Sequence, residues 1–96
     1  MAQPLTQVFA KIKAQLRLPN GADLKVFDRS TGFPISRKKE VRPIALQAYL
    51  RDFDKDTRVA TFLLEIERRI GSQVGARLEL WLAGHRVDGR RKVAGL

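Results

Sequence analysis

The stretch Val41 to Arg51, VRPIALQAYLR, most constrains what this chain can fold into. Its apolar and mixed positions alternate from Ile44 to Arg51. One set is Ile44, Leu46, Ala48 and Leu50, and the other is Ala45, Gln47, Tyr49 and Arg51. This period of two is typical of a strand with one buried face, and Pro43 is tolerated at the beginning of a strand or on an edge strand. The stretch is predicted to be the strand around which the fold is organised.

A helical alternative stays open for the same residues. Pro43 also suits the first turn of a helix, and Leu46, Leu50 and Phe53 would then form an apolar stripe. With a second helix over residues 57–70, the arrangement would be similar to a helix-turn-helix DNA-binding domain. A recognition helix should expose polar, hydrogen-bonding residues, whereas this second helix is mostly apolar and carries two glutamates.

The N-terminal residues 1–18 are predicted to contain an amphipathic helix over residues 3–17. Pro4 suits its first turn, and the apolar residues recur with the spacing of one helix face. These residues are Leu5, Val8, Phe9, Ile12 and Leu16. We expect this face to pack on the core.

Residues 22–96 are predicted to form the remainder of a single domain spanning 1–96. Leu24–Asp28 and RLELWL at 77–82 have the alternation of strands, with a loop or hairpin tip over residues 29–39. Residues 57–70 have helical spacing, with Asp56 or Thr57 as the cap, although a strand is a second interpretation there. A loop over 71–75 and a hairpin turn at Asp88-Gly89 complete the pattern. The expected fold is α+β and β-rich, with the N-terminal helix on a small curled antiparallel sheet or barrel.

The charge balance is the strongest compositional signal. Nineteen Lys and Arg residues oppose ten Asp and Glu, which gives a net charge of +9 and a pI near 10.9. Such a protein is attracted to polyanions, with nucleic acid first and acidic protein surfaces second.

Two basic clusters are the best candidates for a surface that binds polyanions or partners, because guanidinium groups bind phosphate with two hydrogen bonds. They are Arg37, Lys38, Lys39 and Arg42, and Arg86, Arg90, Arg91 and Lys92. Aromatic residues do not interleave with these clusters along the chain, which argues against a base-stacking platform. Trp81 lies on the polar side of its predicted strand, so it is a candidate interface residue, or it packs under the N-terminal helix.

The residues needed for catalysis or metal binding are scarce. The chain has no cysteine and one histidine, His85. Asp52, Asp54 and Asp56 resemble the start of a calcium loop, but position twelve is Leu63, where the closing glutamate is required. We therefore expect no cofactor, no metal and no enzymatic activity. No apolar run approaches the ~18 residues of a membrane span, so we expect a soluble protein of the cytoplasm with no membrane partner.

Three segments, in this order, resemble the small head–tail connector proteins that form the neck of tailed bacteriophages. They are LKVFDRSTGFPISRKK (24–39), VRPIALQAYLRDF (41–53) and QVGARLELWLAGHRVDG (73–89). The resemblance implies a compact β-barrel or sandwich in a homo-oligomeric ring of the virion. Such a ring contacts portal or tail subunits near the DNA channel, and the family has no catalytic residue to transfer. The leading functional prediction is thus a structural connector subunit, and the alternative is a small basic nucleic-acid-binding domain.

Overall fold

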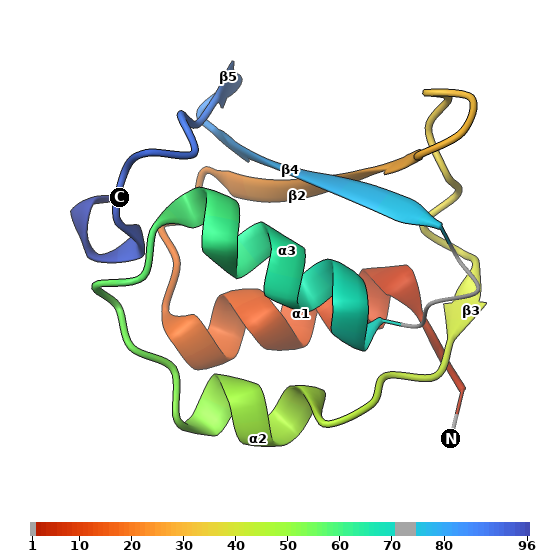
Figure 1. The fold of residues 1–96 in the computed structure, drawn as a ribbon, viewed down its shortest axis with the longest axis horizontal. Coiled ribbons are helices and arrows are strands. Elements are labelled where there is room, and N and C mark those ends of the chain that lie inside the picture. Colours follow the sequence, from red (N-terminus) through yellow and green to blue (C-terminus); the bar gives the residue numbers. More distant parts are fainter. Residues whose placement is uncertain (1, 71–74) are drawn as a thin grey trace.

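A computed structural model describes residues 2–70 and 75–96 of the chain. Figure 1 shows three layers: a sheet, the helices α1 and α3 beneath it, and α2 on the far side of these helices. The elements are β1 (Gln3–Pro4), α1 (Leu5–Leu16), β2 (Ala22–Asp28), β3 (Glu40–Val41), α2 (Leu46–Arg51), α3 (Val59–Arg69), β4 (Ala76–Leu82), β5 (His85–Arg86) and a 3-10 turn at Val93–Gly95.

The main sheet has the strand order β2-β4-β5 and is antiparallel throughout. β2 and β4 pair along their whole length, from Ala22 opposite Leu82 to Asp28 opposite Ala76. β4 and β5 form a hairpin whose turn is Ala83-Gly84, and both residues have positive φ, 51° and 83°. A second, two-residue pairing joins β1 to β3 at the N-terminal end of α1.

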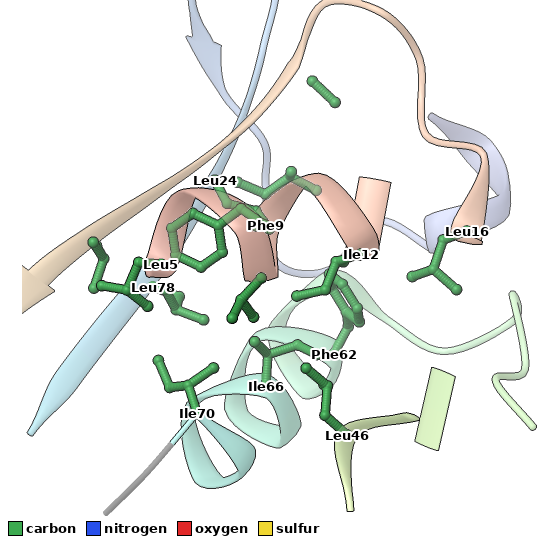
Figure 2. Packing of buried hydrophobic residues seen from close by; sticks show 14 of the residues in the cluster. Leu5, Phe9, Ile12, Leu16, Leu24, Leu46, Phe62, Ile66, Ile70 and Leu78 are labelled. Atoms are coloured by element: carbon green, nitrogen blue, oxygen red, sulfur yellow. The ribbon is translucent and has the colours of Figure 1, made fainter. Parts of the chain in front are cut away.

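The core lies between the sheet and the helices. Alternate residues of β2 and β4, such as Leu24 and Leu78, point toward α1 and α3 and are buried. Figure 2 shows Ile12 of α1 beside Phe62 of α3, with Phe9 of α1 nearer to Leu5 and Leu78. Since both helices lie on the same face of the sheet, no described element covers the opposite face (Figure 1).

The α+β class and the packing of an N-terminal helix on a sheet are confirmed. The predicted stripe of α1 is buried along its entire length, and the helix predicted over 57–70 is α3. The two predicted strands at 24–28 and 77–82 are β2 and β4. The sequence predicted a small antiparallel sheet or a barrel. Neither described sheet closes into a barrel, so the open sheet is the correct form.

The strand prediction for Val41–Arg51 is wrong. Only Val41 lies in a strand, as the end of β3, whereas Leu46–Arg51 is the helix α2. Leu46 and Leu50, four residues apart, are buried in the core. In a strand, Ile44 and Ala48 would lie on the same buried face as Leu46 and Leu50, but both are exposed. The body of the domain is therefore less rich in strands than the alternation predicts.

Asp88-Gly89 forms a turn but not the predicted hairpin. The Asp88 carbonyl accepts a hydrogen bond from the Arg91 amide at 3.0 Å, which closes the turn. The chain beyond it pairs through Lys92 with Arg58, at the start of α3, instead of pairing with the arm that precedes the turn. The α3 cap also differs, because Arg58 occupies that position and no side chain caps the helix.

The loop or hairpin expected over residues 29–39 follows β2 back along its free edge. The Ile35 amide donates to the Val26 carbonyl at 3.0 Å, and Phe27 and Pro34 form an isolated bridge. This return makes the start of the segment hairpin-like. Of the loop predicted over 71–75, residues 71–74 lie outside the described residues.

Candidate nucleic-acid interface

The uncovered face of the main sheet carries aromatic and charged side chains together. We call it the open face. Because successive residues of a strand point to opposite sides, the partners of the buried positions point outward here. They are Asp23, Lys25 and Phe27 on β2, Arg77, Glu79 and Trp81 on β4, and Arg86 on β5.

Each of the two aromatic rings on the open face is covered by a cation from the neighbouring strand. The Lys25 ammonium lies 3.9 Å from the centre of the Trp81 ring. The Arg77 guanidinium carbon lies 4.9 Å from the centre of the Phe27 ring. Such contacts are attractive because the ring face carries negative charge density. Lys25 and Arg77, which belong to neither of the two predicted basic clusters, are therefore interleaved with aromatic rings on this face.

Glu79 is the buried polar residue at the centre of this face, with 8% of its surface exposed. One carboxylate oxygen accepts a hydrogen bond from the Trp81 indole Nε1 at 3.0 Å. The other oxygen pairs with Arg77 and lies 3.9 Å from the Arg86 guanidinium. Burial by itself raises the pKa of Glu79, but the hydrogen bonds from Arg77 and Trp81 and the nearby positive charges outweigh it, so the pKa lies below its ordinary value. Glu79 therefore holds three side chains of the open face in fixed positions.

The first basic cluster predicted from the sequence is divided. Arg37 donates to the Asp23 carboxylate at 2.9 Å and to the Leu24 carbonyl at 3.0 Å, which places its guanidinium at the edge of the open face. Lys38, Lys39 and Arg42 are exposed beside the N-terminal end of α1. A shallow hollow of about 240 Å³ lies beside Arg37, lined also by Lys25, Phe27 and the returning loop.

The second basic cluster is also divided, and it gains a member. Arg86 lies on the open face, opposite Trp81. The other three residues lie at the start of α3, where the Val59 amide donates to the Arg91 carbonyl at 2.8 Å. Arg58 joins them, because its guanidinium donates to the Arg90 carbonyl at 2.6 Å. We call this group the α3 basic patch: Arg58, Arg90, Arg91 and Lys92.

Close packing of the chain makes this patch compact. The Ala60 amide donates to the Gly89 carbonyl at 2.9 Å. A Cβ atom on Gly89 would lie 2.9 Å from the Cβ of Ala60, so only glycine allows the two backbones to approach this closely.

Asp88 is the carboxylate that forms an ion pair within the patch. Asp88 forms an ion pair with Arg90 at 2.9 Å, and the hydrogen bonds from Arg90 lower the pKa of Asp88 to about 2. The Arg91 guanidinium donates to the Gly95 carbonyl at 2.7 Å. Among the residues that the structure describes, Arg58 and Lys92 form no ion pair with an acid. The patch therefore keeps most of its positive charge.

The two predicted clusters do not form one surface. β3, next to the first cluster, and the C-terminal turn, next to the second, lie at opposite ends of the long axis of the molecule (Figure 1). Trp81 lies on the open face, away from α1, so the interpretation that it packs under the N-terminal helix is wrong.

Comparison with known proteins adds no family assignment. No protein-family model, no curated protein and no solved structure matches this chain. Within residues 2–70 and 75–96, no group of three His, Cys, Asp or Glu side chains is placed to hold a metal ion. The helices of the same residues are all too short or too polar to cross a membrane.

Several residues of the interface, Glu79 among them, were not predicted as site residues from the sequence. Lys25, Phe27 and Arg77 share the open face with Trp81, and Arg58 joins the α3 basic patch. Strand alternation indicates which face each residue of β2 and β4 occupies. The signal that was missing is the pairing of β2 with β4, two strands separated by two helices.

Proposed function

We propose that this protein binds nucleic acid and that the α3 basic patch contacts the phosphate backbone. The observation that carries the proposal is the gathering of four cations from two distant segments, of which Arg90 alone forms an ion pair within the described residues. Nucleic-acid backbones carry closely spaced negative charges, and their neutralisation by Lys and Arg is the main source of affinity in non-specific binding.

The position of the patch supports this proposal. It surrounds the N-terminal end of α3, where the helix dipole is positive, and the first turn of α3 contains no acidic residue. Cations at this end of a helix are unfavourable for stability, so their arrangement is not explained by folding alone. An anionic partner offsets this unfavourable term through its contacts with the cations, because the first two amides of α3 already donate to the Arg91 and Gly89 carbonyls.

The test of this proposal is the salt dependence of binding to a short labelled oligonucleotide. The double variant Arg58→Gln with Lys92→Gln should weaken binding at low salt roughly tenfold or more. It should also make the slope of log K against log salt less negative by about 1.5, because two phosphate contacts are lost. Fluorescence anisotropy between 50 and 200 mM salt measures both quantities.

A charge-matched control uses Lys11→Gln with Lys13→Gln on α1, away from the patch. This control lowers the net charge equally and should change the slope little. Equal losses in the two double variants would show that binding follows net charge and not the α3 basic patch.

A ring-forming connector subunit is the second candidate function. Three large apolar side chains, Phe33, Ile44 and Leu64, are 71%, 69% and 53% exposed, and such residues are available for contacts between subunits. We rank it second for a structural reason. The segment that resembles a connector strand contains α2, and the sheet is open where a barrel is implied.

Solution mass distinguishes the second candidate from the first. A ring subunit should give a mass several times that of the 10.9 kDa chain in light scattering coupled to size-exclusion chromatography. Changing Ile44 and Leu64 to Ser should reduce this mass, because the exposed apolar area is removed. A monomer at the highest soluble concentration would count against the ring.

A further inference from the structure

We infer that the open face binds single-stranded nucleic acid, with bases stacked on Trp81 and Phe27. This inference rests on the proposed function and names the class of nucleic acid. It is carried by a separate observation, the interleaving of two aromatic rings with cations on a sheet face that no described element covers.

The register of the sheet sets the distance between the two rings. Phe27 lies opposite Arg77, and Trp81 is four residues further along β4 on the same face. At a rise of about 3.4 Å per residue, the backbone positions that carry the two rings are about 14 Å apart along the strands. They can therefore stack with two separate bases of one strand and do not form a single sandwich around one base.

The cations over the rings suit this role. A base that stacks on Trp81 takes the place of the Lys25 ammonium, which then reaches a phosphate of the same strand. The Arg77 guanidinium can make the same exchange at Phe27, or it can stack on the base itself. Each exchange replaces one cation–ring contact with a base–ring contact and a contact from the cation to the nucleic acid.

Glu79 determines where the phosphates lie. Its carboxylate already pairs with Arg77 at the centre of the face, so a phosphate gains less there than beside the more exposed Arg86 at the edge. Uncharged bases are thus favoured over the centre, with the backbone along the rim. The Trp81 indole is held by the hydrogen bond to Glu79, so little ordering is needed on binding.

A duplex fits this face poorly. Its bases are stacked on one another inside the helix, so their faces are not free to stack on Trp81 or Phe27. A single strand instead exposes the faces of its bases to aromatic side chains. The chain also continues from Arg86 on the open face to Arg90 of the α3 basic patch, which allows the backbone of one strand to follow both sites.

The test compares a 12-nucleotide oligo-dT, an oligo-U of the same length and a 12-base-pair duplex at one ionic strength. The wild-type chain should bind the single strands at least tenfold more tightly than the duplex. Trp81 is the only tryptophan, so quenching of its fluorescence by the single strands reports stacking without any substitution. Trp81→Leu and Phe27→Leu should each weaken single-strand binding roughly tenfold to a hundredfold. Phe33→Leu, an exposed ring outside the face, should leave it unchanged.

Other outcomes separate this inference from the proposed function. Equal or tighter duplex binding with unchanged Trp81 fluorescence would overturn the inference. The proposed function would still stand in that case if the Arg58→Gln, Lys92→Gln variant reduced the salt slope. A lack of binding to all three probes at low salt would overturn both. A change in solution mass on Trp81→Leu, without any effect on nucleic-acid binding, would assign the open face to contacts between protein chains and would also overturn the inference.

Discussion

Replacing Phe62 with alanine is expected to lower the free energy of unfolding by about 3–5 kcal/mol. Phe62 is fully buried on α3 and lies among side chains of α1 and α3 (Figure 2). Its ring centre is 5.3 Å from that of Phe53, in an edge-to-face contact that links α3 to the chain after α2. Alanine would leave a cavity where the helices meet, because the surrounding structure relaxes only partly. Urea unfolding followed by circular dichroism measures the loss.

Phe33→Ala is the matched control for this prediction. The Phe33 side chain is 71% exposed at the tip of the loop after β2, so its removal should change stability by less than about 0.5 kcal/mol. Similar costs for the two substitutions would contradict the position of Phe62 in the core. Unchanged m-values in both variants would show that the comparison concerns the native packing and not the unfolded state.

The regular parts of this fold were predictable from the sequence because their patterns are long enough to be unambiguous. α1 places an apolar residue at every turn from Leu5 to Leu16, and α3 does the same from Val59 to Ile66. RLELWL alternates cleanly and forms β4. For these segments, local periodicity and burial in the folded chain agree.

Val41–Arg51 was not predictable by the same means, because its apolar residues fit both the period of two of a strand and the spacing of a helix. α2 has six residues, so it buries only Leu46 and Leu50, and two positions do not distinguish a helix from a strand. The deciding contacts are tertiary. α2 packs on α1, and the Ile44 amide before it donates to the Arg69 carbonyl of α3 at 2.8 Å. These contacts depend on where α1 and α3 lie, which the pattern of a short segment does not contain.

The candidate site was predictable in its chemistry but not in its grouping. Clusters of cations that are continuous in the sequence are divided by the fold, since Arg37 and Arg86 turn to the open face while their neighbours do not. Conversely, Arg58 joins Arg90 through a contact between residues 32 positions apart. A basic patch is a property of the surface, and the surface is set by strand pairing and by the path of the C-terminal segment.

Replacing Glu79 with glutamine should reduce stability at pH 7 by about 1–2 kcal/mol. The amide keeps the size of the side chain but removes the charge that binds Arg77 and attracts Arg86. A hydrogen bond to a charged group contributes about 1.5–3 kcal/mol, and we expect a loss near or below the lower end of that range because solvent screens the two partly exposed arginines. The measurement is urea unfolding at pH 7, in parallel with Glu40→Gln, which removes an exposed carboxylate that has no ion pair within the described residues.

The same two variants should differ in their response to acid. In the folded protein the pKa of Glu79 lies below its ordinary value of 4.5, so the unfolded chain binds a proton more readily than the native one. The stabilisation from Glu79 is therefore fully present above about pH 4.5 and is lost as the pH falls through the lower pKa of the folded state. Wild type and Glu79→Gln should converge in stability as the pH is lowered below 4.5, while Glu40→Gln should follow the wild type. Parallel curves for wild type and Glu79→Gln would mean that Glu79 does not hold the open face through its charge.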